Sequence, residues 1–456
     1  MLLQIQGYLG LLDFGFSTGS VRSLVIAQEG DARLHDLTRT TISWVYRRIS
    51  WAIWLVGAVV ALVLLYAPLA WDGVSQVEIA GAFAIMAGGS AMLMPMSLAP
   101  DVLQAQQRLG TFNRLLLVRA IADGVVSVAL VAAGFGLVGL ACSQVASASV
   151  FYFGSELATR SITDRNRRTA PSADNAVLSE LWRVTRLTFM QKLANAATRG
   201  SDGILIGMTL GPAAVTVYVI TLRAIQSAIT LATRVIPMTL PGLTQLWTQG
   251  LSVQLMATYE RASRLVVLGI VCAGLVAGTV NAEFVVVWVG ADRLGSSALN
   301  WWSVCATALV GYGAFPTTLL TATGHLRRIS LVSLLEASLK IALGLGMLYW
   351  LGLPGIAVAS ALAWLATSGP VMFADIAGVF STPRLRLAWD SVCAPLFRMA
   401  LPAWISLFAA SHFHATRWWE VAAKAALVAI FLACSSAMFG LTREDRSYLK
   451  GALQRA

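Results

Sequence analysis

The chain has 456 residues, of which 57% are hydrophobic and only 12% are charged, whereas soluble domains have about 45–50% apolar and 25% charged residues. These proportions exclude an ordinary soluble protein, and recurring apolar stretches of 20 or more residues indicate membrane-spanning helices. The net charge is +11, and whether it indicates nucleic-acid binding depends on where the cations lie along the chain.

The apolar stretches predict an all-α polytopic membrane protein with thirteen transmembrane helices. Each stretch is long enough to cross about 30 Å of hydrocarbon. In chain order they cover residues 3–23, 49–71, 79–100, 115–135, 137–157, 186–208, 212–234, 263–288, 299–321, 330–350, 354–376, 393–411 and 419–440.

The distribution of Lys and Arg predicts how these helices are oriented. Seven alternate connections hold 22 of these residues, and the opposite connections hold only Arg293 and Arg417. Cytoplasmic loops of membrane proteins are enriched in cations. The sequence therefore predicts a multi-pass protein of a bacterial inner membrane with a cytoplasmic C-terminus, and the positive charge is a topology signal that does not call for nucleic acid.

An internal repeat indicates two bundles of related structure. The segment Gly-Leu-Val-Gly-Leu-Ala at 136–141 matches Gly-Leu-Pro-Gly-Ile-Ala at 352–357, and Trp71 matches Trp288 at nearly the same offset. Both copies have the same orientation, so we expect bundles related by a pseudo-two-fold axis along the membrane normal.

The repeat also predicts the domain organisation. The helix at 186–208 opens the second copy, and its counterpart would precede residue 1. The expected plan is thus 6+6+2 helices with the first helix missing from the numbered chain. The expected segments are a five-helix bundle at 1–158, a cytoplasmic linker at 159–185, a six-helix bundle at 186–378, and two additional helices with a tail at 379–456.

Glycine and proline pairs inside the spans mark positions where helices are weakened and could act as hinges. They are Gly88 and Gly89 with Pro95, Gly311 and Gly313 with Pro316, and Gly369 with Pro370. Gly and Pro are also common packing residues in membrane helices, so both interpretations stay open.

Charged residues inside the spans are the candidate functional groups, because each is costly in hydrocarbon unless it has a partner or a water-filled cavity. Arg119 and Asp123 lie four residues apart on one predicted helix, as do Glu336 and Lys340 at the repeat position. Each set predicts an ion pair within its helix, which serves either the structure or the coupling of an ion. Arg22, Arg234 and Arg398 lie near cytoplasmic ends, where long side chains reach the headgroups. Arg22 is also a candidate substrate-binding residue, together with the group described next.

A second group predicts a polar cavity between the bundles. Lys192, Arg199 and Asp202 share roughly one face of the helix at 186–208, Arg223 lies midway along the next helix, and Asp13 occupies the corresponding position of the first bundle. The excess of cations suits a phosphate or pyrophosphate, which Arg binds with two parallel hydrogen bonds. The alternative is a structural ion pair such as Arg199 with Asp202.

Two motifs resemble a known family. The run Gly-Tyr-Leu-Gly-Leu-Leu-Asp-Phe-Gly at 7–15, continuing through Arg22, and the run Ser-Asp-Gly-Ile-Leu-Ile-Gly at 201–207, followed by 210–215 and Tyr218, are similar to segments of lipid-linked oligosaccharide flippases (Wzx-like). These belong to the multidrug/oligosaccharidyl-lipid/polysaccharide exporter (MOP) superfamily. The resemblance implies a central cavity that opens alternately to each side of the membrane. It also implies that Asp13, Arg199, Asp202 and Arg223 face this cavity.

The expected function is export of a polyprenyl-diphosphate-linked oligosaccharide, with the lipid-linked glycan and membrane lipids as partners, together with a polysaccharide polymerase and glycosyltransferases. Multidrug or metabolite efflux is the alternative on the same fold. A polymerase or ligase enzyme is disfavoured, because every predicted outer connection has about ten residues or fewer and such enzymes need a catalytic outer loop. We therefore expect no enzymatic activity, no cofactor and no bound metal.

Overall fold

The computed structural model describes residues 15–29, 32–66, 75–160 and 174–441. The chain divides into two compact units, Met1–Lys192 (unit 1) and Leu193–Ala456 (unit 2). Within the described ranges every regular element is a helix. The prediction of an all-α protein is confirmed.

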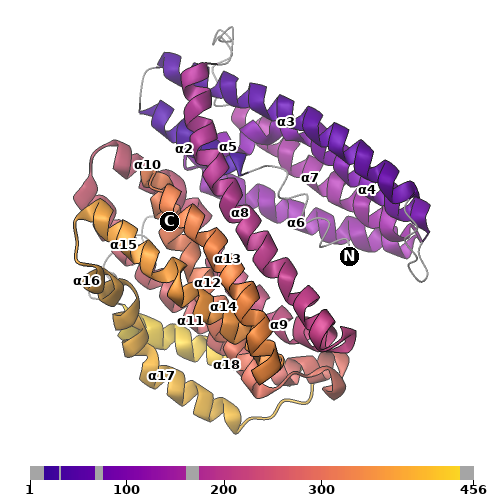
Figure 1. The fold of residues 1–456 in the computed structure, drawn as a ribbon, viewed down its shortest axis with the longest axis vertical. Coiled ribbons are helices and arrows are strands. Elements are labelled where there is room, and N and C mark those ends of the chain that lie inside the picture. The colour runs from indigo at the N-terminus through magenta and orange to yellow at the C-terminus, as the bar shows by residue number, and fades with distance from the viewer. Residues whose placement is uncertain (1–14, 30–31, 67–74, 161–173, 442–456) are drawn as a thin grey trace. The chain divides into compact units, whose positions relative to one another are not determined.

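Unit 1 is a bundle of helices (Figure 1). Long helices pack as neighbours in the pairs α3 with α4, α4 with α7 and α6 with α7. The elements are α2 (Phe16–Gln28), α3 (Ala32–Tyr66), α4 (Gln76–Leu93), η1 (Met94–Ser97), α5 (Leu98–Ala105), α6 (Leu109–Ala132), α7 (Gly136–Arg160) and the first part of α8 (Asn175–Thr209).

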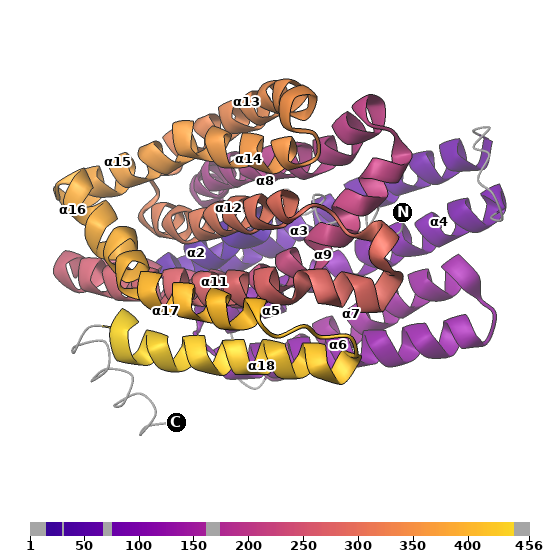
Figure 2. The same cartoon turned by 90° about the horizontal axis from the view of Figure 1, so that it is seen from below.

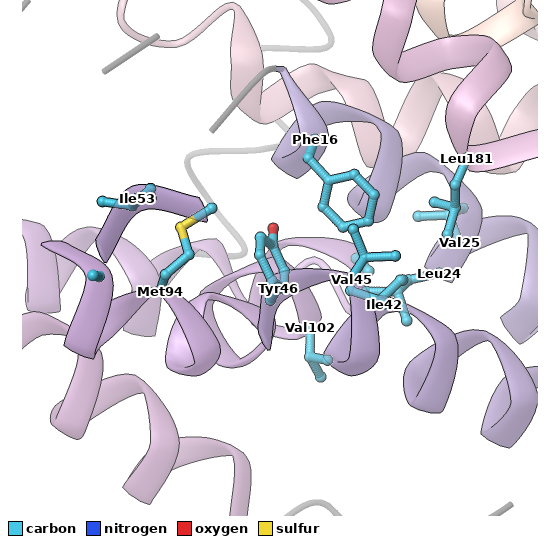
Figure 3. Packing of buried hydrophobic residues seen from close by; sticks show 12 residues of the cluster. Phe16, Leu24, Val25, Ile42, Val45, Tyr46, Ile53, Met94, Val102 and Leu181 are labelled. Atoms are coloured by element: carbon cyan, nitrogen blue, oxygen red, sulfur yellow. The ribbon is translucent and has the colours of Figure 1, made fainter. Parts of the chain in front are cut away.

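The core of unit 1 forms where α2 crosses α3, α5 and the start of α8. Phe16 packs edge-to-face on Tyr46 at a ring separation of 5.0 Å, and Leu24, Ile42 and Leu181 are completely buried beside them (Figure 3). Close approach of α2 and α8 depends on Gly15 and Gly19, because a β-carbon at either position would crowd Thr188 or Thr185. The core therefore holds α2 against α8.

Unit 2 contains the end of α8 and the remaining helices. Figure 2 shows α17 and α18 side by side along α11, and both contact it. The elements are α9 (Pro212–Thr233), η2 (Pro237–Thr239), α10 (Leu240–Thr248), α11 (Ser252–Val289), η3 (Ala291–Arg293), α12 (Ser297–Thr323), α13 (Arg327–Leu351), α14 (Pro354–Ala366), α15 (Ser368–Phe380), α16 (Arg384–Ala388), η4 (Trp389–Cys393), α17 (Ala394–Ser411), α18 (Trp418–Ser435) and η5 (Ser436–Gly440).

Eleven helical segments in the described residues are long and apolar enough to span a membrane, and they coincide with eleven of the thirteen predicted spans. The other two predictions are the span at 3–23, of which only the part from residue 15 is described, and the span at 186–208. The latter lies within α8, which also extends back to Asn175. The second part of the expected linker at 159–185 is thus helical.

The repeated Gly-Leu-x-Gly segments lie between two packed helices in both units. Gly136 and Gly352 both have a positive φ, at 50° and 65°, which residues other than glycine rarely adopt. Three residues later, a β-carbon on Gly355 would overlap the backbone carbonyl of Met347. Each turn reverses the chain between two packed helices, α6 and α7 in unit 1 and α13 and α14 in unit 2.

Two of the three predicted weak points interrupt their helices. Pro95 lies in the 3₁₀ segment η1 between α4 and α5, and the helix at 354–380 is broken at Thr367, just before Gly369 and Pro370. Pro316 instead lies inside the continuous helix α12. The interruptions confirm that these sites weaken helices, while their use as hinges stays a prediction.

Replacing Gly355 by Ala tests the tight turn between α13 and α14. We expect Gly355→Ala to lower the stability by about 1–3 kcal/mol, because the added methyl group meets backbone that cannot move away cheaply. The thermal unfolding midpoint of the purified protein measures this. Gly346→Ala is the matched control, since Gly346 has no atom within 4 Å of an added β-carbon, and it should leave the midpoint unchanged or raise it slightly.

Candidate functional site

A buried polar cluster joins α8, α9 and α13 within unit 2. Lys340 Nζ lies 2.7 Å from Asp202 Oδ1 and donates a hydrogen bond to the Thr198 carbonyl at 2.8 Å. The Tyr218 hydroxyl donates to the other carboxylate oxygen, Oδ2, at 2.9 Å. Both oxygens of Asp202 are thereby engaged by neighbouring helices.

Apolar side chains surround this cluster and shield it from water. The side chains of Lys340 and Asp202 are only 7% and 14% exposed. Leu205, Ile206 and Leu222 belong to the same hydrophobic core as Tyr218. In such surroundings an ion pair is stronger than at a surface, and the loss of either partner leaves an uncompensated charge.

The partner of Lys340 differs from the prediction. The sequence predicted a pair with Glu336 on the same helix, whereas the ion pair formed is with Asp202 on α8. Lys340 is buried and faces α8, while Glu336 is half-buried. The long lysine side chain reaches across to a carboxylate with better shielding, so the prediction of an intrahelical pair was wrong.

The equivalent prediction for Arg119 and Asp123 was also wrong. Asp123 accepts hydrogen bonds from Gln144 Nε2, at 2.9 Å to each carboxylate oxygen, and from the Ser147 hydroxyl at 3.3 Å. The Arg119 guanidinium lies over the Phe151 ring, 5.8 Å from its centroid. No ion pair joins Arg119 to Asp123 in the described structure, because α7 supplies both side chains with partners across the helix pair.

Helix α9 has a polar face that the rest of unit 2 does not cover. Its buried side packs through Tyr218, Leu222, Ile225 and Ile229. Its exposed polar residues recur at helical spacing and lie on one side of the helix. They are Arg223, Gln226, Ser227 and Thr230, and the exposed Arg234 follows directly after the end of the helix.

The other predicted site residues are placed in part. Lys192 is half-buried on α8 and is the last residue of unit 1. The backbone of Arg199 also belongs to α8, but its side chain lies outside the described part of the structure, as does Asp13. Their meeting around one cavity between the bundles therefore stays a prediction.

Arg22 forms an ion pair instead of simply extending to the headgroups. Its Nη1 atom lies 2.8 Å from Glu180 Oε1, and Arg183 binds the same carboxylate through two hydrogen bonds of 2.7 and 2.8 Å. These bonds, first from Arg183 and then from Arg22, hold the pKa of the Glu180 carboxyl below its ordinary value against the opposing effect of partial burial. Glu180 thus ties α2 to the N-terminal end of α8.

The sequence reasoning also missed a buried pair outside the repeat. Lys424 Nζ lies 2.6 Å from Glu283 Oε1 and donates to the Phe413 carbonyl at 2.8 Å. Both residues lie within predicted spans, Glu283 in 263–288 and Lys424 in 419–440. Two charges of opposite sign inside apolar helices were the available signal.

The sequence matches a family described as "Polysaccharide biosynthesis protein" over residues 32–296. This match covers more than half of the chain. The chain belongs to this family. A comparison with curated protein sequences found no significant match.

Solved structures of MOP superfamily proteins share the fold. One is a MOP superfamily transporter from Pyrococcus furiosus, with 14% identity over 85% of this chain and 87% of that chain and a TM-score of 0.63. Another is a multidrug resistance MATE family transporter in an outward-facing conformation, with 14% identity, the same coverage and a TM-score of 0.66. A third, a MATE protein in complex with MaL6, has 15% identity over 84% and 86% of the two chains and a TM-score of 0.62. The predicted resemblance to the MOP superfamily is confirmed in the fold.

Removing one partner of the Asp202 and Lys340 pair should destabilise the protein strongly. We expect Asp202→Ala to cost about 3–5 kcal/mol, because it leaves the Lys340 ammonium buried and unpaired. The double variant Asp202→Ala with Lys340→Met should recover most of this loss, as measured by chemical unfolding. The control is Arg160→Ala, which removes an ion pair with Glu156 in which the two side chains are 70% and 38% exposed and should cost about 0–1 kcal/mol.

The Glu180 cluster should make stability depend on pH. A carboxyl whose pKa is lowered by folding stabilises the protein above its unfolded pKa, near 4.5, and this contribution is lost as the pH falls through the lower pKa of the folded state. Glu180→Gln should therefore flatten the acid side of a plot of unfolding midpoint against pH. Glu156→Gln, which removes a loose surface pair of 3.7 Å, should retain the wild-type slope, and equal slopes in all three proteins would contradict this account.

Proposed function

We propose that the protein moves a polyprenyl-diphosphate-linked oligosaccharide, or a related polysaccharide precursor, across the bacterial inner membrane by alternating access. Membership in the polysaccharide biosynthesis family and the fold of MOP superfamily transporters support a transport role in glycan assembly. Glycosyltransferases would supply such a substrate and a polymerase would consume it.

The observation that carries this proposal is the polar face of α9. Arg223 lies eleven residues after Pro212, where α9 begins, so it is about 16 Å from that end of the helix and near the middle of about 30 Å of hydrocarbon. Its side chain is exposed on unit 2. Charged side chains at this depth almost always face a bundle interior or a water-filled cavity.

The chemistry of this face suits a lipid-linked glycan. Arg223 offers a planar set of donors that matches phosphate oxygens. Gln226, Ser227 and Thr230, on the same exposed side of α9, offer amide and hydroxyl groups that can hydrogen-bond to phosphate or sugar hydroxyls. A face of this kind fits the wall of the cavity that the family resemblance implies.

Efflux of cationic compounds is less well supported. A binding site for such compounds needs an available carboxylate, and Asp202 would be the natural candidate on α8. Its two oxygens are already engaged by Lys340 and Tyr218. The neighbouring exposed group on α9 is the Arg223 cation, which would repel a cationic substrate.

Replacing Arg223 tests whether its side chain binds the diphosphate of the substrate. We expect Arg223→Ala to lower glycan export about 10- to 100-fold, which corresponds to the loss of about 1.5–3 kcal/mol from hydrogen bonds between charged groups. Export by Arg223→Lys should lie between that of the wild type and that of Arg223→Ala, because lysine keeps the charge without the planar donors. The measurement is surface polysaccharide in cells that lack the chromosomal copy, together with the lipid-linked precursor that accumulates in the inner membrane.

The control is Arg328→Ala, which removes an exposed cation on α13 and should export like the wild type. All variants are compared at equal membrane abundance. Wild-type export by Arg223→Ala under these conditions would refute the role of Arg223 in substrate binding.

A further inference from the structure

The Lys340 ammonium occupies a setting made of oxygen atoms. It lies 2.7 Å from the Asp202 carboxylate and 2.8 Å from the Thr198 carbonyl. Carboxylate and carbonyl oxygens are the ligands that hard cations take in proteins, and membrane transporters use them for coupling ions at mid-membrane sites. Lysine carries its charge on a compact ammonium group at the end of a flexible chain, so it can stand where a monovalent cation would.

The arrangement is held from outside the ion pair. Tyr218 donates to Asp202 Oδ2 at 2.9 Å, so the oxygen that contacts Lys340 keeps its orientation. Tyr218 is itself buried in a hydrophobic core with Leu205 and Leu222. The carboxylate would therefore remain in place if the ammonium were removed.

The two copies of the sequence repeat differ at the position of Lys340: only the copy in unit 2 has a cation there. Lys340 stands 217 residues after Asp123, at the equivalent position of the repeat. In unit 1 this position holds a carboxylate that binds the neutral donors Gln144 and Ser147. In unit 2 it holds a cation that neutralises a carboxylate of another helix.

We propose that Lys340 is a tethered cation that fills a monovalent-cation site formed by Asp202 and the Thr198 carbonyl. The site binds Na⁺ only when Lys340 is absent, and in the intact protein the ammonium replaces a soluble ion between α8 and α13. The consequence for coupling rests on the proposed transport function: transport then requires no Na⁺ at this site of unit 2.

The test measures Na⁺ binding to the purified full-length chain. Thermal unfolding midpoints are recorded in NaCl and in choline chloride at equal ionic strength. The midpoint of the wild type should show no Na⁺-specific shift. Lys340→Ala should have a lower midpoint in choline chloride, which Na⁺ should raise by several degrees. The double variant Lys340→Ala with Asp202→Asn should lose that rise. If Lys340→Ala does not fold, Lys340→Gln replaces it, because its amide can still donate to the Thr198 carbonyl while the charge is gone.

Lys424→Ala is the matched control. Lys424 also contacts one carboxylate and one carbonyl, those of Glu283 and Phe413, but no donor like Tyr218 holds the second Glu283 oxygen in the described structure, so this carboxylate should not remain in place for Na⁺. An equal Na⁺-specific shift in both variants would mean that Na⁺ merely compensates for any lost ammonium, and would overturn the proposal. The proposal would also be overturned if neither Lys340→Ala nor Lys340→Gln showed a Na⁺-specific rise of the midpoint. A Na⁺-specific rise in the wild type that Asp202→Asn abolishes would overturn it as well. These readouts do not involve the glycan, so they succeed or fail independently of the proposed substrate.

Discussion

The ion pair between Asp202 and Lys340 is the interaction on which the charge arrangement of unit 2 depends. Hydrocarbon offers no water to solvate an ion, so each charge inside the bundle must meet an opposite charge or a hydrogen-bonding group. Lys340 meets both a carboxylate and a carbonyl. The pair connects two helices that are far apart in sequence and fixes how α8 and α13 face each other.

This pairing determines which charges remain available. Because Asp202 is paired with Lys340, it does not neutralise Arg223. The exposed side chain of Arg223 lies on the opposite side of α9 from Tyr218. The same helix therefore separates a neutralised, buried polar cluster from a positively charged exposed face. Tyr218 and Arg223 are five residues apart, which places them on different sides of the helix.

The sequence was sufficient for features that depend on local chemistry. Apolar length predicted eleven of the spans found in the described residues, and the glycine and proline positions predicted the interruptions at Pro95 and just before Gly369. It was insufficient for partners on different helices. Spacing alone favoured Glu336 for Lys340, but α8 presents a better-shielded carboxylate from 138 residues away in sequence, and helix packing rather than spacing decides between them.

Three ion pairs among the described residues have a buried cation, and they share one property. Lys340, Lys424 and Arg22 each bond a carboxylate on a helix distant in sequence, and both lysines also bond a backbone carbonyl. A flexible ammonium with three donors can satisfy two such acceptors at once, whereas the Glu180 carboxylate is shared by two arginines. Because each pair joins different helices, its geometry is set only after those helices pack. The charges thus restrict which packed arrangements hydrocarbon can tolerate. This explains why Lys340, predicted to pair within its own helix, is found bound to a carboxylate of another helix.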